Sequence, residues 1–249
     1  MNSNYILPIT IVVAGLLIAG AVFFVGKSST PGATQDGAKV TARVYDPAID
    51  HILGNPNAEV KVVEYMDLEC LHCKIFEVTM HQIMDYYGDS GRVAWVQRHF
   101  PLAQIHSKAP KEAEAAECAA ELGGNAAYWK FVDTVFEVTP SNNGLDLAQL
   151  PQIAGQIGLD VGAFKTCLDS GKYAKKVTDQ YKEAIDAGGQ GTPYVLIMVG
   201  TDAVALAGAQ PYDSMRAAID AVLAQLPDSN VGGTVPTGSP QPTSSPEVQ

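Results

Sequence analysis

The chain has 249 residues, of which 47% are hydrophobic and 17% are charged, so it can build the core of one folded domain with additional segments. Its formal net charge is −11 and it contains no basic cluster, which argues against nucleic-acid binding. We attribute the acidic balance to solubility and infer no partner from it.

The first segment of interest is an uncharged run at residues 6–25, ILPITIVVAGLLIAGAVFFV. A helix of this length spans roughly 30 Å, the thickness of the hydrocarbon core of a bilayer. A cleaved secretory signal is the alternative, but the apolar region of a signal is usually about 7–15 residues, with a basic flank before it and a small-residue cleavage site after it. The sequence therefore predicts an uncleaved signal-anchor over residues 1–25, with its transmembrane helix at 6–25.

Two polar segments flank a central domain. Residues 26–47 begin with GKSSTPGATQDGAK, which is rich in Gly, Ser, Thr and Pro and predicts a flexible linker. Residues 227–249 have five prolines and few large apolar side chains, so they predict a disordered tail. The folded domain is therefore expected over residues 48–226.

Within this domain, apolar runs and helical periodicity predict alternating elements. Strands are expected at 59–66, 92–100, 194–199 and 203–207, and helices at 71–87, 107–122, 126–138, 145–157, 161–169, 174–187 and 212–225. This order predicts an α/β fold with one mixed sheet flanked by helices. The helices from about 104 to 188 are expected to form an all-helical insertion between the two halves of the sheet.

The motif with the clearest chemistry is Cys70-Leu71-His72-Cys73, which follows the strand VKVVEYM and opens a helix. Unpaired N–H groups and the helix dipole at such a position favour a thiolate, and His72 could add a hydrogen bond or a positive charge. The thiolate is the attacking species in disulfide exchange. Cys73, one turn further, would be shielded and would resolve a mixed disulfide.

The cysteine pair has two alternative roles, in a metal site or in an inert disulfide. A structural zinc site would need a second pair of ligands at similar spacing, and Cys118 and Cys167 each stand alone. An inert disulfide is the other alternative. The sequence predicts redox exchange at Cys70 and Cys73, with no metal and no cofactor.

Five separated stretches resemble the DsbA-like thioredoxin-fold thiol–disulfide oxidoreductases, in particular membrane-anchored bacterial proteins with a DsbA domain. They are DHILGNPNAEVKVVEYMDLECLHC (50–73), RHFPL (98–102), AAECAAELGG (115–124), FKTCLDSGKYAKKV (164–177) and GQGTPYVLIMVG (189–200). The resemblance implies a thioredoxin fold. It also implies a cis bond between Thr192 and Pro193, facing the cysteines, where the Thr192 backbone would pair with substrate.

The resemblance assigns roles to further residues. Glu64 matches the buried acid six residues before the first cysteine, a proton acceptor or relay for the second cysteine, although an outward-facing charge is the alternative. His72 matches the dipeptide of the DsbA group. Leu71 departs from it, because the family often has Pro there; Leu71 adjoins the substrate side of the site, and the departure leaves the redox potential open.

Structural roles are expected for the remaining cysteines and for two of the histidines. Cys118 and Cys167 are an even pair, and in an oxidising compartment they are expected to form a stabilising disulfide, with buried free thiols as the alternative. His99 and His106 are expected in the core or on the surface rather than in the site.

These expectations combine into a membrane-tethered oxidoreductase that introduces disulfides into reduced exported polypeptides. The resemblance implies reoxidation by a quinone-linked membrane partner of the DsbB or VKOR kind. Because cytosolic thiols are kept reduced, the catalytic domain is expected outside the cytoplasm, in the periplasm or at the cell surface, on a single-pass anchor. The alternatives are a reductase of the same compartment and a thioredoxin-fold module that binds copper or polypeptide without turnover.

Overall fold

The computed structural model describes residues 39–227. The membrane anchor expected at 1–25, most of the expected linker and the expected tail after Pro227 lie outside these residues. Within the described part of the chain, no helix is both long and apolar enough to cross a bilayer.

The core of the fold is a six-stranded mixed sheet with strand order β1-β6-β5-β3-β4-β2. The strands are β1 (Lys39–Thr41), β2 (His51–Gly54), β3 (Val60–Met66), β4 (Val93–His99), β5 (Tyr194–Val199) and β6 (Asp202–Ala207). Only β3 and β4 pair in parallel, and the other neighbours are antiparallel. The predicted α/β fold with a mixed sheet is confirmed.

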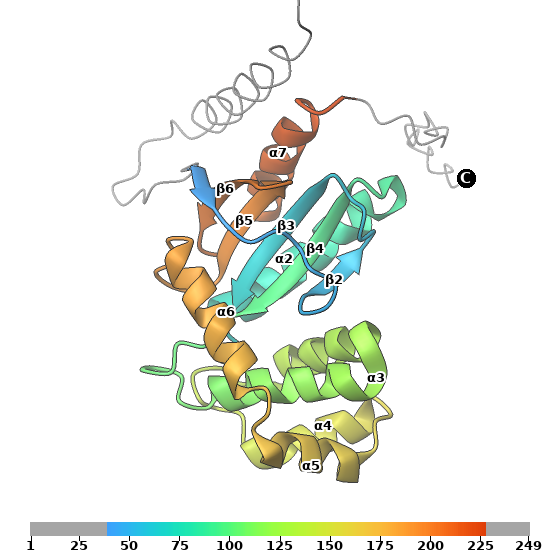
Figure 1. The fold of residues 1–249 in the computed structure, drawn as a ribbon, viewed down its shortest axis with the longest axis vertical. Helices are drawn as coiled ribbons and strands as arrows, with labels where there is room; N and C mark the ends of the chain where they lie inside the picture. Colours follow the sequence, from blue (N-terminus) through green and yellow to red (C-terminus); the bar gives the residue numbers. More distant parts are fainter. Residues whose placement is uncertain (1–38, 228–249) are drawn as a thin grey trace, which may run out of the picture.

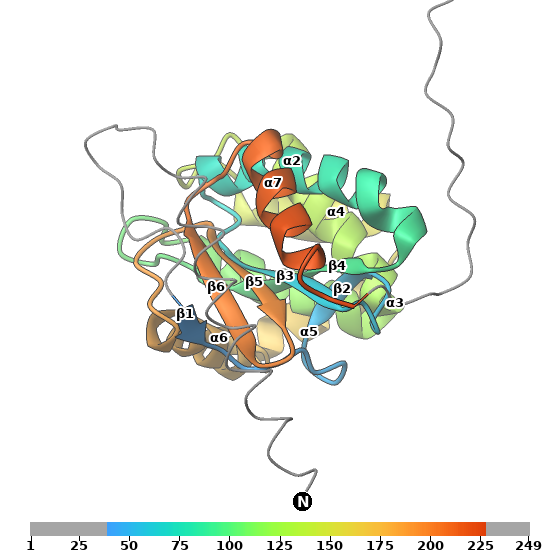
Figure 2. The ribbon, with the colours of Figure 1, turned by 90° about the horizontal axis from the view of Figure 1, so that it is seen from above.

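Helices cover both faces of this sheet (Figure 2). Helices α2 (Leu71–Tyr87) and α7 (Tyr212–Leu223) lie on one face, and α6 (Ala174–Asp186) lies on the other. Alternate side chains of β3 serve the two faces, as the pleat requires: Val62 and Met66 belong to the core under α2, whereas Val63 and Tyr65 belong to the core under α6. Such a strand, buried on both sides, reads as the nearly continuous apolar run that identified it.

The predicted helical insertion lies between β4 and β5, below the sheet in Figure 1. It contains α3 (Ala109–Val138), a short 3₁₀ turn, α4 (Leu150–Gln156) and α5 (Val161–Ser170), and α6 leads back to the sheet. The two helices predicted at 107–122 and 126–138 form one kinked element. The kink is at Gly124, whose φ of 72° is outside the helical region and is accessible to glycine.

The start of the folded domain differs from the prediction, because residues 39–47 are not a free linker. β1 pairs with β6 at the edge of the sheet. The Arg43 guanidinium donates to both Asp50, at 2.8 Å, and Glu183, at 3.0 Å. The fully buried Arg98 also donates to Asp50, at 3.0 Å. These charge-assisted contacts attach the segment to the domain, although its composition resembles that of a linker.

Candidate active site

The candidate active site begins where β3 ends and α2 starts. Cys70 is the N-cap residue of α2, with extended backbone angles, and Cys73 lies in the first turn. Both are free thiols and both are buried, Cys70 to 6% exposure and Cys73 to 0%. The buried apolar strand and the amphipathic helix therefore place two thiols at a helix N-terminus, as the sequence predicted.

The two thiols have opposite electrostatic environments. The pKa of Cys70 is lowered to about 5, mainly by the hydrogen bond with the Cys73 thiol. Burial opposes this change, while the hydrogen bond with Thr192 and the main-chain N–H groups of Cys73 and His72 add to it. The pKa of Cys73 is raised, chiefly by burial and then by the neighbouring Cys70. Cys70 is thus the thiolate at neutral pH, and Cys73 keeps its proton.

The opposite wall of the site is the cis peptide bond between Thr192 and Pro193. The sulfur of Cys70 lies 3.4 Å from the main-chain oxygen of Thr192, to which its thiol donates. Strand β5 starts one residue after Pro193, so the sheet holds this wall in place. Leu71 is 47% exposed beside Cys70 and leaves an apolar surface at the entrance.

His72 contributes to the site through its main chain, and the role expected for its imidazole stays a prediction. The residue is exposed, and its influence on Cys70 comes from its main-chain N–H group. That group belongs to the N-terminal turn of α2, where N–H groups lack helical partners. The contact therefore depends on the position of His72 in the chain rather than on its imidazole.

Glu64 lies under the cysteine pair with none of its surface exposed. It faces Gln97 in the parallel register of β3 and β4, and its Oε2 accepts a hydrogen bond of 3.1 Å from the Trp95 indole. Its pKa is raised, first by burial and then by the carboxylate of Glu77, with a smaller effect of Cys70. Glu64 in turn raises the pKa of Cys73. The outward-facing alternative is wrong, and Glu64 is a buried acid coupled to both thiols.

Asp67 and His106 complete the site, and the sequence did not assign them to it. The main-chain N–H of Asp67 donates to the Cys73 sulfur at 3.5 Å, and its carboxylate lies 2.9 Å from His106 Nδ1. Burial lowers the pKa of His106, but Asp67 and then the charge of Cys70 raise it, and the net change is upward. The only local signal was the position of Asp67, three residues before Cys70.

A second buried acid pair lies behind Cys70. Glu69 directly precedes Cys70, and the pKa of Glu112 is raised to about 10, first by burial and then by Glu69. Glu69 also holds a loop of the insertion: its main-chain oxygen accepts from Asn142 at 2.8 Å, and its Oε2 accepts from Gly144 at 3.1 Å. Asn142 and its neighbours Ser141 and Asn143 have positive φ, a conformation that such contacts must maintain.

The other two cysteines form a disulfide between α3 and α5. Cys118 and Cys167 are 49 residues apart in sequence, and their Cα atoms are 5.9 Å apart. The bridge closes the helical insertion and includes neither thiol of the site. His99 lies in the core, where its Nε2 is 3.0 Å from Glu117 Oε1, in agreement with its expected structural role.

Comparison with known proteins relates this arrangement to named relatives. A family model described as Thioredoxin matches residues 48–221. The Na⁺/H⁺ antiporter NhaA of Herminiimonas arsenicoxydans is 32% identical over 177 residues, which are 71% of this chain and 27% of that protein. NhaA 3 of Salinispora tropica is 34% identical over 148 residues, or 59% of this chain and 21% of that protein. The chain thus matches about a quarter of the length of these curated relatives.

Solved structures share both fold and sequence with this chain. Pseudomonas aeruginosa DsbA2 is 27% identical with a TM-score of 0.58, covering 69% of this chain and 93% of that one. Wolbachia pipientis alpha-DsbA1 is 25% identical with a TM-score of 0.57, covering 70% and 94%. BdbD of Bacillus subtilis, at 21% identity, shares the fold, with a TM-score of 0.65 and coverage of 76% and 100%. The chain belongs to the thioredoxin family, and within it to the DsbA-like thiol–disulfide oxidoreductases that its sequence resembles.

Proposed function

We propose that this chain is a membrane-tethered oxidase that introduces disulfides into exported proteins through Cys70 and Cys73. The observation that carries this proposal is the contrast between the two thiols. Cys70 has a pKa of about 5 at the N-terminus of α2, whereas the pKa of the fully buried Cys73 is raised. A stabilised thiolate makes the reduced form of a cysteine pair more favourable, so the disulfide form becomes a stronger oxidant.

The first step is attack by a substrate thiolate on the Cys70 sulfur of the oxidised pair. A substrate–Cys70 bond forms, the Cys70–Cys73 bond breaks, and its electron pair leaves on Cys73. The raised pKa of Cys73 means that this sulfur takes up a proton. Glu64, whose pKa is also raised and which interacts electrostatically with Cys73, is the acid that supplies it.

In the second step, another thiolate of the substrate attacks the substrate sulfur of the mixed disulfide. The substrate disulfide forms, and Cys70 leaves as the thiolate that the helix N-terminus stabilises. The enzyme has then gained two electrons and the substrate has lost two. The main-chain oxygen of Thr192, 3.4 Å from the Cys70 sulfur, is placed to accept a hydrogen bond from an extended substrate segment.

Turnover requires an oxidant for the reduced pair. A quinone-linked membrane protein of the DsbB or VKOR kind fits this need, because it accepts two electrons from a dithiol. The uncharged segment at residues 6–25 supports a location of the chain at the same membrane. An extracytoplasmic domain is required because cytosolic thiols are kept reduced.

The test is oxidation of a reduced, unfolded test protein by the full oxidised chain purified in mild detergent. Cys70→Ser should abolish disulfide formation. Cys73→Ser, incubated with the disulfide form of the same test protein, should accumulate a covalent complex visible on a non-reducing gel, because the Cys70 thiolate breaks that disulfide and no Cys73 thiol resolves the mixed disulfide. Full activity of Cys70→Ser would exclude the proposal, and tight binding of the test protein without any disulfide formation by the wild-type chain would favour a binding module.

A further inference from the structure

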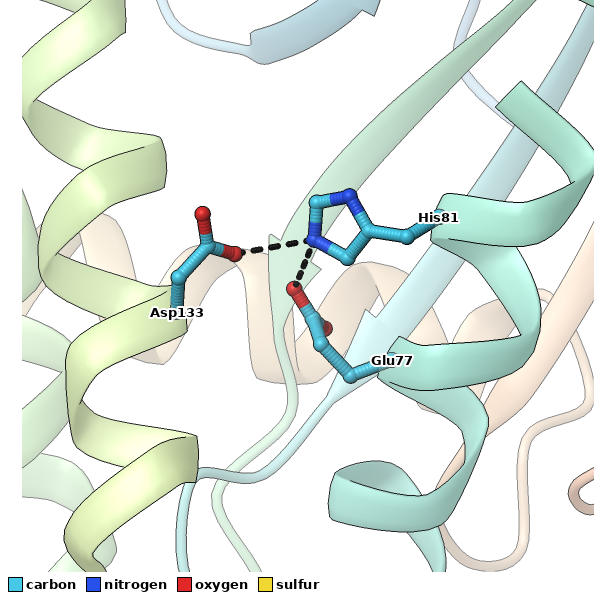
Figure 3. A group of neighbouring side chains, drawn as sticks. All are labelled: Glu77, His81 and Asp133. Atoms are coloured by element: carbon cyan, nitrogen blue, oxygen red, sulfur yellow. Dashed lines mark hydrogen bonds and ion pairs between the residues drawn. The ribbon is translucent and has the colours of Figure 1, made fainter. Parts of the chain in front are cut away.

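A second group of chemically active side chains lies further along the active-site helix. Glu77 and His81 are four residues apart on α2, so they share one face of the helix, and Asp133 approaches them from α3 (Figure 3). His81 Nε2 lies 3.0 Å from Asp133 Oδ1 and 3.5 Å from Glu77 Oε1. One nitrogen and one oxygen from each carboxylate all lie within 4.8 Å of one another.

The two separations from His81 Nε2, 3.0 and 3.5 Å, are close to those between ligand atoms in the first coordination sphere of a divalent transition metal. Zinc binds imidazole nitrogen and carboxylate oxygen at about 2.0–2.2 Å, which places tetrahedral ligand atoms roughly 3.3–3.6 Å apart. Three protein ligands and one open position are typical of sites that also hold water. Only small shifts of the partly exposed His81 and Asp133 side chains would bring the three atoms around one ion.

The contacts around Glu77 hold its carboxylate in a fixed orientation, as expected of a preorganised metal ligand. Its side chain is only 6% exposed. Its Oε2 accepts a hydrogen bond of 3.0 Å from Gln97, which fixes the carboxylate, as partners of metal ligands do. Its buried Oε1 accepts no hydrogen bond and is directed at His81 Nε2 (Figure 3). The His81 ring is in turn restrained by an edge contact with Trp95, with centroids 5.5 Å apart.

Two carboxylates around one imidazole supply the negative charge that a dication needs, and the site is open to solvent. A protonated imidazole balances one of the two carboxylates, whereas a dication with a neutral imidazole balances both. The side chains of His81 and Asp133 are 41% and 43% exposed, so an ion can enter from solvent. Uptake of the metal would displace the proton of His81.

We infer that Glu77, His81 and Asp133 form a binding site for a divalent transition metal ion of the zinc type. The site is separate from the cysteine pair, and it joins the second and third turns of α2 to α3. Through Gln97, which pairs in register with Glu64, it also adjoins the buried acid under Cys73. If these three residues bind no metal, the proposed oxidase activity of the cysteine pair is unaffected.

The probe is Co²⁺, added to the full oxidised chain in detergent after a thiol reagent has shown that no free thiol remains. Blocking Cys70 and Cys73 as a disulfide prevents them from binding the metal. We expect one saturable Co²⁺ site with visible absorption bands, from which one equivalent of Zn²⁺ displaces the Co²⁺. His81→Asn and Asp133→Asn should each weaken binding at least tenfold. Asp85→Asn, which removes an exposed carboxylate from the same helix, should change it less than twofold.

A second measurement does not depend on the variants. In ¹⁵N-labelled wild-type chain, Zn²⁺ should shift the imidazole signals of His81 more than those of the other four histidines. Absence of saturable Co²⁺ binding would overturn the inference. So would unchanged binding in both His81→Asn and Asp133→Asn, or a Zn²⁺ shift confined to another histidine.

Discussion

The sulfur of Cys70 lies 3.4 Å from the main-chain oxygen of Thr192, on the residue that precedes the cis Pro193. These residues are 122 positions apart in the chain, and the adjacent strands β3 and β5 bring them together. One side of the contact supplies the sulfur of lowered pKa, and the other supplies the main-chain oxygen that we propose as an acceptor for an extended substrate. The sulfur and this proposed acceptor are therefore held in one fixed geometry.

The first prediction concerns the stability of the reduced chain. The pKa of Cys70 falls from the ordinary 9.0 to about 5 on folding. Because it is lowered, this thiol stabilises the folded state fully above the unfolded pKa, and the contribution is lost as the pH falls through about 5. Urea unfolding of the reduced chain should show a free energy of unfolding that declines between pH 9 and pH 5 relative to Cys70→Ser. Parallel pH profiles of the two proteins would contradict the assignment.

The second prediction distinguishes the effects of the His106 and His72 side chains on the pKa of Cys70. His106 is buried next to Asp67 and interacts with the charge of Cys70, whereas His72 is exposed and acts through its main chain. His106→Ala should raise the pKa of Cys70, seen as a shift to higher pH in the rate of alkylation by iodoacetamide. His72→Ala keeps the main-chain N–H and should leave the profile in place. The reverse pattern would restore the role that the sequence suggested for the His72 imidazole.

The third prediction concerns Glu64 as a proton donor and acceptor. Glu64→Gln preserves the shape of the side chain and an acceptor for Trp95. Without the acid, oxidation of a reduced peptide should slow by roughly 10²-fold, a typical contribution of general acid–base catalysis. Alkylation of Cys70 should keep its dependence on pH, because this reaction involves no proton transfer at Cys73. An unchanged rate of peptide oxidation would exclude the relay.

The fourth prediction concerns the disulfide of the helical insertion. Replacing both Cys118 and Cys167 by Ala removes a bridge between residues 49 apart, which should destabilise the fold by about 4 kcal/mol by the loop-entropy estimate. The reduction potential of Cys70 and Cys73 should stay the same, because this bridge lies outside the site. Chemical unfolding measures the first effect and equilibration with glutathione the second. A large change in potential would show that the two pairs are coupled.

Local sequence patterns were sufficient to predict the strands that are apolar runs and the helix that follows the Cys-x-x-Cys motif. β3 and β5 are apolar runs, and α2 is long and follows directly from the Cys-x-x-Cys motif. β1 and β2 were missed because they have only three and four residues, and their stability comes from pairing with β6 and β4 rather than from their own composition. The folded domain consequently begins earlier than expected.

The residues of the candidate active site also differ in how well the sequence alone predicts them. Cys70, Cys73 and Pro193 stand in recognisable local motifs, so the sequence identified them. His106 and Glu112 are polar residues of a loop and a helix, and only tertiary packing places them beside Asp67 and Glu69. The buried state of a titratable group depends on every element packed around it, and a single sequence does not contain that list of neighbours.

The most direct test of the proposed oxidase role is the reduction potential of the Cys70–Cys73 pair in the full chain, measured by equilibration with glutathione buffers. An oxidase should have a value well above the roughly −270 mV of thioredoxin, because the thiolate of Cys70 stabilises the reduced form. A value at or below that of thioredoxin would contradict the role as an oxidase. It would indicate a reductase that receives its electrons at the membrane.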